Sequence, residues 1–333
     1  MKHTANVVVI GTGGTIASIG RGPLDLIEYA VTGQKLEADE IVARVPILAE
    51  VANVRAVRFK AVSSTDMGPV QWLQLARLIE QLAAQESGID GFVITHGTAT
   101  TEETAYFLNL VLHVRQPVVV VGSQRPASGL STDADINLVN AVRTAASPDS
   151  LGLGVLVMLN DEIQAAREVT KTSTLRMQTF KSPDFGVLGH VDADAVSYYR
   201  RPIRRHAPDT EFSLEGLETL PRVDIVYSYA GADGTAIDAF VAAGCRGLVS
   251  AGFAPGSGTK AETAAMERAI ASGVAVVQST RAGSGRVTQR QNLSEKGIIA
   301  ADNLSPQKAR ILLMLALTRG NHADELARIF ATY

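Results

Sequence analysis

The chain has 333 residues, with 31 Lys and Arg against 34 Asp and Glu, a net charge of -3 and 46% hydrophobic residues. This composition is typical of a globular protein, and the length favours two domains or one large domain with an appendage. The single cysteine, Cys245, excludes an internal disulfide and a zinc or iron-sulfur site built from cysteines. The near balance of charge argues against nucleic acid as a partner, because duplex binding draws on several clustered basic side chains.

The amino-terminal residues predict neither an export signal nor a membrane anchor. The first apolar run covers only residues 7–10, whereas a signal peptide needs about 7 to 15 apolar residues. Elsewhere the sequence has no stretch that approaches the roughly 18 uncharged apolar residues of a membrane span. We therefore expect a cytoplasmic protein with no membrane contact.

Short apolar runs alternate with amphipathic segments along the chain. A helix is expected around 72–82, where apolar residues recur at intervals of three and four. The runs that favour strands are 7–10, 91–95, 117–122, 154–159, 224–227, 247–250 and 274–278. This alternation is typical of parallel strands that are covered on both faces by crossover helices, so the prediction is an α/β fold.

The composition changes between about residues 198 and 220, where the chain is polar, basic and interrupted by prolines. We expect residues 1–200 to form an N-terminal catalytic α/β domain, 201–221 a linker, and 222–333 a smaller C-terminal α/β domain. The four arginines of this stretch could form a nucleic-acid patch. In a weakly acidic chain they fit a solvated linker or an interface better.

The first expected strand ends in a glycine-rich turn, Gly11-Thr12-Gly13-Gly14-Thr15-Ile16. Its spacing is not that of a dinucleotide fingerprint, because Ile16 takes the place of the last glycine. The glycines allow a sharp turn that presents the hydroxyl of Thr15 beside unobstructed backbone amides. This hydroxyl is a candidate nucleophile, although a threonine after glycine is more often a turn or cap residue.

More hydroxyls follow the strand expected at 91–95. Thr100 or Thr101 can cap the next helix, with Glu103 or Thr104 completing a capping box, whereas Thr98 is not needed for that role.

A third polar cluster, at 168–174, places Lys171 among short hydroxyls. Burial would lower the pKa of Lys171 and let it accept a proton from a threonine, although a lone lysine is more often a surface residue.

Together these segments resemble the bacterial L-asparaginase family over nearly the full length of the chain. The motifs that carry the resemblance are 11–17, 63–67, 95–98 with 102–107, 122–126, 160–161, 167–172, 180–182 and 303–309. The resemblance implies a large doubly wound domain, a smaller parallel α/β domain and a homotetramer with active sites between two subunits. It also implies an amidohydrolase that converts L-asparagine to L-aspartate and ammonia through a threonyl acyl-enzyme, with no metal or other cofactor.

The resemblance also assigns roles to individual positions. It makes Thr15 the nucleophile and Tyr29, on the loop after it, the group that helps to activate the Thr15 hydroxyl. Thr98 and Lys171 match the family's second threonine and its lysine. Ser64 matches the serine that holds the substrate carboxylate. The other substrate-binding positions are Gly14, Thr65, Gly97, Ala99 and Ser123, of which Ser123 is near the scissile amide.

The sequence departs from the family pattern where the substrate's α-ammonium group binds. Ala99 stands in place of an aspartate, and Thr65 in place of a residue that is usually Gln or an acid. Ser257 and Asn292 fall where an asparagine and a glutamate are common in the region that the neighbouring subunit supplies. The loop 18–36 is also longer than usual. Losing one partner of a buried charge pair typically costs ~2 to 5 kcal/mol.

Three hypotheses follow from these departures. The protein is an asparaginase that tolerates the loss, an amidohydrolase for an asparagine-like amide with a substituted or missing α-amino group, or a non-catalytic binding protein on the same scaffold. The last is disfavoured because Thr15, Thr98, Lys171 and Ser64 are all in place.

Overall fold

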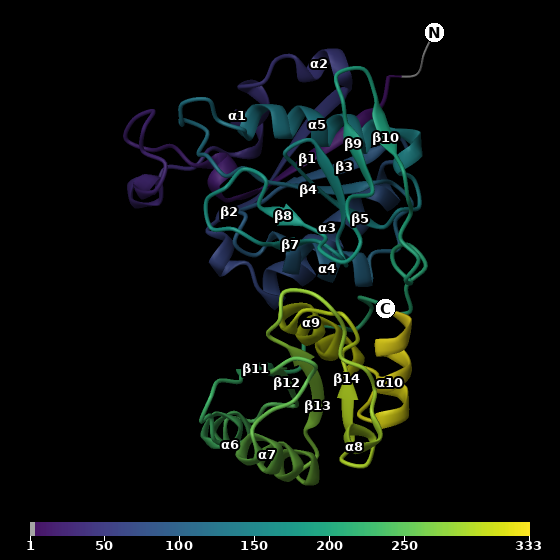
Figure 1. Ribbon diagram of the computed structural model, residues 1–333. Helices are drawn as coiled ribbons and strands as arrows, with labels where there is room; N and C mark the ends of the chain where they lie inside the picture. Colours follow the sequence, from purple (N-terminus) through teal and green to yellow (C-terminus); the bar gives the residue numbers. More distant parts are fainter. Residues whose placement is uncertain (1–3) are drawn as a thin grey trace. The chain divides into compact units, whose positions relative to one another are not determined.

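The computed structural model describes residues 4–333 and divides into two compact units. The first unit ends at Glu215, and the second covers Gly216–Tyr333 (Figure 1). Part of the proline-containing segment after residue 200 packs on the first unit. The backbone N–H of Ala207 donates to the carbonyl of Asn109 at 2.9 Å, and the hydroxyl of Thr210 donates to the carbonyl of Leu110.

The first unit is built on an eight-stranded sheet. Its five strands β1 to β5 run parallel, and β6, β9 and β10 extend one edge in antiparallel pairings. In sheet order the strands are β10 (Val196–Tyr198), β9 (Gly189–Val191), β6 (Glu162–Ala165), β5 (Val155–Leu159), β4 (Val118–Val121), β3 (Gly91–Thr95), β1 (Asn6–Gly13) and β2 (Asn53–Val62).

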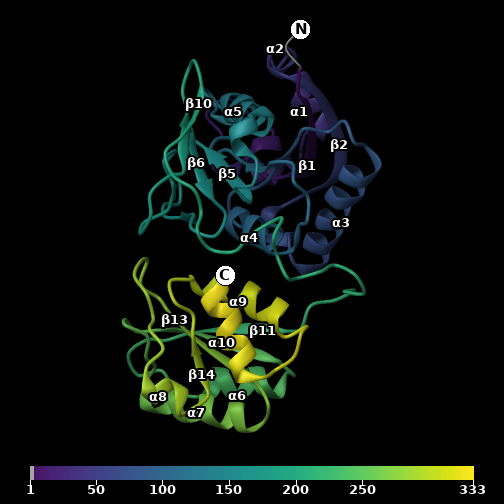
Figure 2. The same cartoon turned by 90° about the vertical axis from the view of Figure 1, so that its right-hand side faces the viewer.

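Helices cover both faces of this sheet. The helices α1 (Ala38–Ala43), α2 (Leu48–Val51) and α5 (Ala134–Ala146) lie on one face, and α3 (Pro69–Gln85) and α4 (Thr101–Val111) lie on the other (Figures 1 and 2). Branched side chains such as Val9, Val93 and Val119 are fully buried between the layers. Burying the parallel strands on both faces excludes water from the backbone hydrogen bonds of the sheet.

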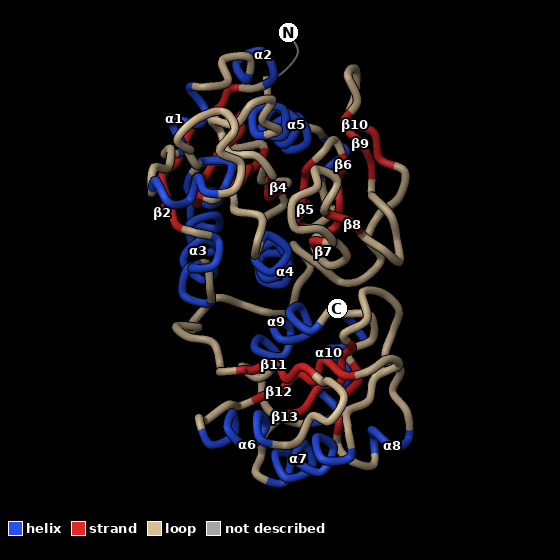
Figure 3. Tube along the Cα trace, turned by 60° about the vertical axis from the view of Figure 1, so that its left-hand side comes forward, coloured by secondary structure: helices blue, strands red, loops and turns tan. Residues whose placement is uncertain are grey.

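Short 3₁₀ helices and a small strand pair lie in the loops at the carboxyl ends of these strands. The 3₁₀ helices η1 (Thr15–Ala17) and η2 (Glu28–Thr32) follow β1, and η3 (Ser64–Asp66) follows β2. The two-stranded pair β7 (Thr170–Lys171) and β8 (Phe180–Lys181) lies in the long loop region beside β5 (Figure 3). At the amino end of β5, in contrast, lies the short 3₁₀ helix η4 (Pro148–Ser150).

The second unit has a four-stranded parallel sheet in the order β11 (Val223–Tyr227), β12 (Gly247–Gly252), β13 (Ala275–Thr280) and β14 (Ile298–Ala300). One face carries α6 (Thr235–Ala242), α7 (Lys260–Ala271) and α8 (Gln291–Ser294), and the other carries α9 (Pro306–Ala316) and α10 (Ala323–Thr332) (Figure 1). The predicted fold class, a large doubly wound domain with a smaller parallel α/β domain, is confirmed. Among the described residues, no helix combines the length and apolar character needed to cross a membrane.

The apolar runs of the sequence do not include β2. This strand forms the edge of the sheet and carries three exposed basic residues, Arg55, Arg58 and Lys60. Charged side chains on an edge strand hinder pairing with other chains, so the sequence of such a strand does not read as an apolar core element.

Candidate active site

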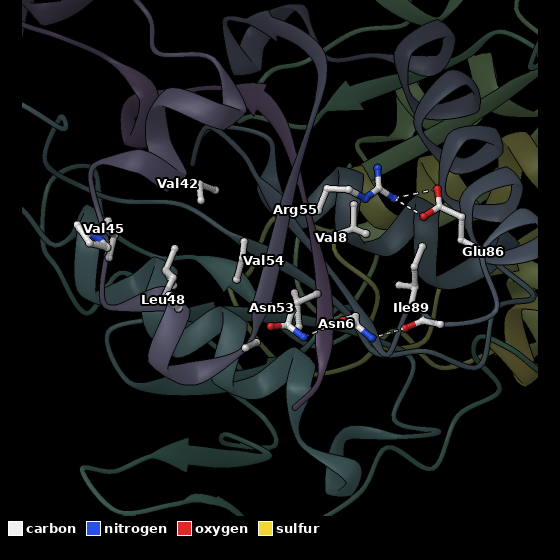
Figure 4. A pocket seen from close by; sticks show the side chains of 15 residues that line it. Asn6, Val8, Val42, Val45, Leu48, Asn53, Val54, Arg55, Glu86 and Ile89 are labelled. Atoms are coloured by element: carbon white, nitrogen blue, oxygen red, sulfur yellow. Dashed lines mark hydrogen bonds and ion pairs between the residues drawn. The ribbon is translucent and has the colours of Figure 1, made fainter. Parts of the chain in front are cut away.

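A cavity of about 740 Å³ lies at the amino ends of β1 and β2 in the first unit (Figure 4). An ion pair between Arg55 and Glu86, with a closest approach of 2.8 Å, lies in its wall. The side chains that line this cavity include no hydroxyl, thiol, imidazole or amine among the residues the structure describes. In parallel α/β sheets ligands bind at the carboxyl ends of the strands, and that edge carries the reactive groups here.

The turn after β1 brings Thr15 against the loop that follows β3. Gly13 and Gly14 have φ of 93° and 85°, the left-handed region that favours glycine. A Cβ on Gly14 would lie 2.2 Å from the backbone of Gly97, so the two loops touch through their backbones. Each glycine is followed directly by a threonine of the predicted site, Thr15 or Thr98, and both threonines are buried.

Thr15 has a direct hydrogen-bond partner. Its Oγ1 lies 2.8 Å from the hydroxyl oxygen of Tyr29, which η2 positions. The loop that carries Tyr29 is tied back to the segment after Thr15, because the N–H of Leu36 donates to the carbonyl of Ala17 at 2.7 Å and the N–H of Ile19 donates to the carbonyl of Gln34 at 3.1 Å. The extended loop therefore places Tyr29 on the candidate nucleophile.

Lys171 and Thr98 form the second hydrogen-bonded pair of the candidate site. The Nζ of Lys171 donates to Thr98 Oγ1 at 2.7 Å, across 73 positions of sequence. Burial lowers the pKa of the Lys171 ammonium below its usual value, and the nearby Glu102 carboxylate opposes this shift. A lysine with a lowered pKa next to a hydroxyl can take up or release a proton during a reaction.

Glu102 is a further residue of the candidate site, and no local sequence pattern gives it a role there. It is buried in the first turn of α4, and its Oε1 accepts from the hydroxyl of Thr170 at 3.2 Å and from the backbone N–H of Lys171 at 3.3 Å. Glu102 thereby fixes β7 beside Thr98. Neighbouring Glu103 is only partly buried, and no local pattern separates these two acids in the sequence.

Ser64 lies against the same backbone contact. A Cβ on Gly97 would be 2.6 Å from the Cβ of Ser64 and 2.9 Å from the Cα of Gly14. The hydroxyl of Thr100 donates to the carbonyl of Ser64 at 2.6 Å, and the hydroxyl of Thr101 donates to the carbonyl of Gly97 at 3.0 Å. Thr100 is the N-cap residue of α4, which is one of the two predicted positions, but its hydroxyl makes no capping hydrogen bond. The hydroxyls of Thr100 and Thr101 instead hold the site loops together.

The remaining predicted positions occupy the rim and the floor of the site. Thr65 and Ala99 are exposed, and the hydroxyls of Thr65 and Ser63 are 3.0 Å apart. Ser123 is fully buried, and its hydroxyl donates to the carbonyl of Arg125 at 2.6 Å. The adjoining Gly122 lies close to Thr98, because a Cβ there would be 3.0 Å from the Thr98 methyl carbon. The backbone at Ser123 thus borders the site, while its hydroxyl is bonded within its own loop.

His96 supports the loop from below. It is completely buried, its Nδ1 lies 2.8 Å from the carbonyl oxygen of Gly97, and its Nε2 lies 2.9 Å from Thr104 Oγ1. Since a carbonyl only accepts, Nδ1 carries the proton and Nε2 accepts from Thr104, whose oxygen in turn accepts from the Trp72 indole at 2.9 Å. Burial lowers the pKa of His96 to about 4, and the hydrogen bond to Gly97 opposes that shift. A neutral imidazole therefore anchors the Gly97 carbonyl.

The predicted site residues lie along the sheet in the same order as the strands that they follow. Along the carboxyl edge of the sheet, from β2 through β1, β3 and β4 to β5, lie Ser64, Thr15, Thr98, Ser123 and Asn160. Among residues 4–333, no group of three or more His, Cys, Asp and Glu side chains is arranged to hold a metal ion.

Comparison with known proteins identifies the family. Residues 6–204 match the model for the N-terminal domain of asparaginase, and residues 222–330 match the model for the glutaminase/asparaginase C-terminal domain. The chain is 42% identical over 332 residues to L-asparaginase 2 of Bacillus subtilis, covering 100% of this chain and 88% of that protein.

Two other similar proteins are named for different cellular locations. A probable periplasmic L-asparaginase of Haemophilus influenzae is 41% identical, covering 98% of this chain and 93% of that protein. The crystal structure of a probable cytoplasmic L-asparaginase from Campylobacter jejuni matches with a TM-score of 0.95 and 38% identity, covering 99% of this chain and 100% of that one. With both family models matched in succession and full-length relatives at this level of identity, the chain belongs to the asparaginase family of amide hydrolases.

Proposed function

We propose that this protein hydrolyses the side-chain amide of L-asparagine to L-aspartate and ammonia through a threonyl acyl-enzyme. Two hydrogen bonds carry the proposal, one between the hydroxyls of Thr15 and Tyr29 and one from Lys171 to Thr98, on two loops whose glycines are in contact. A hydroxyl with an adjacent proton-transfer group is the arrangement that nucleophilic catalysis needs. The names of the similar proteins support the same activity.

In the first step, Thr15 Oγ1 attacks the amide carbon while its proton passes to the Tyr29 oxygen along their hydrogen bond, and Tyr29 releases its own phenolic proton toward the amide nitrogen. The tetrahedral intermediate collapses as a proton reaches the amide nitrogen, the C–N bond breaks and ammonia departs. In the second step, water attacks the aspartyl ester and gives a proton to the Lys171–Thr98 pair. The ester bond then breaks, the Lys171–Thr98 pair returns that proton to the Thr15 oxygen, and aspartate leaves.

The substrate lies along the carboxyl edge of the sheet in this proposal. Ser64 and the backbone of Gly14 and Gly97 hold its carboxylate end, and exposed Thr65 and Ala99 form the rim. The backbone beside Ser123, rather than its bonded hydroxyl, borders the amide. Backbone donors that stabilise the oxyanion are commonly worth about 3 to 4 kcal/mol in such reactions.

A second candidate substrate class follows from Ala99. The side chain is exposed at the rim and carries no charge, so it offers nothing to an α-ammonium group. An asparagine-like amide with a substituted or missing α-amino group would lose less from this change than L-asparagine would.

The activity is tested by measuring ammonia release from L-asparagine by the purified chain and its Thr15→Ala and Thr15→Ser variants. We expect the alanine variant to lose about 10⁴-fold or more in kcat, because no other group replaces the nucleophile. The serine variant keeps a hydroxyl and should retain part of the activity. Mass spectrometry of quenched reactions should find an aspartyl group on Thr15. Undiminished ammonia release by the alanine variant would contradict the mechanism.

We also propose that the protein assembles as a homotetramer, which its resemblance to the family indicates, and that it lies in the cytoplasm, which its short amino-terminal apolar run favours. Support for the location is divided, because one similar protein is named cytoplasmic and another periplasmic. Sedimentation should give a mass four times the 35.2 kDa of one chain, and fractionation of the producing cells should place the protein with cytoplasmic markers. A monomeric mass or a periplasmic fraction would overturn the corresponding part.

A further inference from the structure

A cavity of about 630 Å³ lies at the carboxyl edge of the first unit, separate from the groups assigned above. Its walls come from the loop after β1, the loop after β4, the end of β5 and the turn between β7 and β8. The residues that line it include Leu26, Ile27, Gln124, Asn160, Leu175 and Arg176.

The position of this cavity follows from the order of strands. The proposed carboxylate end of the substrate lies at Ser64 after β2, and the acyl carbon lies between Thr15 after β1 and Thr98 after β3. Continuing in the same direction, the next strand ends are those of β4 and β5, which carry Gln124 and Asn160. The cavity therefore lies beside the candidate site, on the side away from the proposed carboxylate end of the substrate.

The wall formed by the long loop is held in place. Leu26 packs against Gly129, where a Cβ would lie 3.0 Å from a Leu26 methyl carbon. The N–H of Leu130 donates to the carbonyl of Pro23 at 2.7 Å, and the N–H of Gly20 donates to the hydroxyl of Ser128 at 2.8 Å. The same loop carries Tyr29, so the reactive pair and the cavity share one structural support.

The lining of the cavity is cationic and apolar. It contains two arginines, Arg125 and Arg176, and no aspartate or glutamate among the residues the structure describes. Arg125 donates through Nη1 to the carbonyl of Ser131 at 2.6 Å, whereas the guanidinium of Arg176 forms no hydrogen bond within residues 4–333, and only its backbone N–H donates, to the Ser173 hydroxyl. Leu26, Ile27, Leu175 and Met177 supply the apolar part of the surface. An anionic group attached to an aliphatic chain complements this lining.

Gln124 adds a polar group without a competing bond. Its side chain is 9% exposed, and its Nε2 has no hydrogen-bond partner among the described residues. Rotating this amide toward the cavity breaks no existing hydrogen bond of Nε2. An acceptor oxygen in the cavity would give that nitrogen the partner that buried polar groups normally have.

We infer that this cavity binds the leaving group of β-aspartyl dipeptides, in which the side-chain nitrogen of asparagine is the amino nitrogen of an aliphatic amino acid. The inference rests on the proposed function and extends its substrate class. Thr15 forms the same aspartyl ester, the C–N bond breaks, and the amino acid takes up the proton and leaves in place of ammonia. Water then hydrolyses the ester, so one dipeptide and one water give aspartate and the second amino acid. Binding of the dipeptide's C-terminal carboxylate in the cavity offsets the interaction with the α-ammonium group that Ala99 does not provide.

The test compares three substrates of the purified full chain: L-asparagine, β-aspartyl-leucine and β-aspartyl-leucine amide, whose terminal carboxylate is neutralised. We expect kcat/KM for β-aspartyl-leucine to exceed that for its amide about tenfold or more, because a charged hydrogen bond to Arg176 is lost in the amide. In Arg176→Gln, the ratio of kcat/KM for β-aspartyl-leucine to that for L-asparagine should fall by a similar factor. Arg201→Gln removes an exposed arginine outside the cavity and should leave the ratio unchanged.

The outcomes separate the two proposals. Hydrolysis of L-asparagine with no cleavage of β-aspartyl-leucine would overturn the inference and leave the proposed function intact. Equal rates for the dipeptide and its amide, or an unchanged ratio in Arg176→Gln, would also overturn it. If L-asparagine yields neither ammonia nor an aspartyl ester on Thr15, the proposed function itself fails.

Discussion

The Nζ of Lys171 donates a 2.7 Å hydrogen bond to Oγ1 of Thr98, and the buried carboxylate of Glu102 accepts from the backbone N–H of the same lysine at 3.3 Å. The lysine is thus held at both its backbone and its amine. One acid fixes the strand that carries it, and the partial burial of the amine weakens its hold on a proton.

This arrangement predicts the pH dependence of the reaction. The neutral amine of Lys171 accepts a proton, and its fraction grows as pH rises toward a pKa that burial has lowered from the usual lysine value. We expect kcat to rise with pH and to level off below the range where an ordinary lysine titrates. Lys171→Arg cannot lose its charge near neutral pH and should lower kcat by about 10² to 10⁴-fold with no such rise.

A matched control for that experiment is Lys181→Met, because Lys181 lies on the paired strand β8 and bonds Glu162 at 2.8 Å. It should keep the pH profile of the unaltered protein. If Lys171→Arg shows the same rise of kcat with pH as the unaltered protein, another group accepts the proton.

The contact between Tyr29 and Thr15 gives a second prediction. Tyr29→Phe keeps the ring on η2 but removes the oxygen 2.8 Å from Thr15 Oγ1. We expect kcat for L-asparagine to fall about 10² to 10⁴-fold, the usual range for losing a positioned proton-transfer group. Binding of L-aspartate, measured by calorimetry, should change little. A variant with unaltered kcat would remove Tyr29 from the mechanism.

Ala99→Asp tests the missing acid at the rim. A carboxylate there would attract the α-ammonium group of L-asparagine and should raise kcat/KM about tenfold or more, less than a fully buried pair would give because the position is exposed. Ala99→Asn has nearly the same shape without the charge and should give a smaller change. Succinamate has no amino group, so its hydrolysis should not improve; equal gains for both substrates would contradict charge pairing as the cause.

His96 predicts a loss of stability in acid. The folded protein holds this imidazole neutral with a pKa of about 4, whereas the unfolded chain protonates it near pH 6.5. Between these values the unfolded state binds more protons, so the free energy of unfolding falls as pH falls. The contribution of His96 to this loss is on the order of 3 kcal/mol at pH 4.

The measurement uses Trp72, the single tryptophan of the chain, whose indole bonds the same threonine that contacts His96. Denaturant titrations followed by its fluorescence at pH 4 to 7 should show a weaker pH dependence in His96→Gln. His322→Gln removes an exposed imidazole and should keep the dependence of the unaltered protein. Parallel curves for all three proteins would mean that His96 does not carry the effect.

Much of the site could be predicted from the sequence because its residues follow strand ends in local motifs. Gly13 and Gly14 indicate a turn whatever the rest of the chain does, and the turn fixes where Thr15 points. The apolar runs of β1, β3, β4 and β5 are equally local, because strands buried on both faces need continuous apolar side chains. The edge strand β2 is not predicted in this way, because it is interrupted by exposed charged residues.

The sequence by itself determined the fold class, the family and the reactive residue types, since motifs and periodicity record short-range requirements of the backbone. Only the tertiary structure decided which groups meet. It placed Lys171 on Thr98, turned the hydroxyls of Thr100 and Ser123 toward loop carbonyls, and buried Glu102 while leaving Glu103 partly exposed. Burial, hydrogen-bond partners and pKa shifts depend on packing between segments far apart in sequence, and no local pattern encodes that packing.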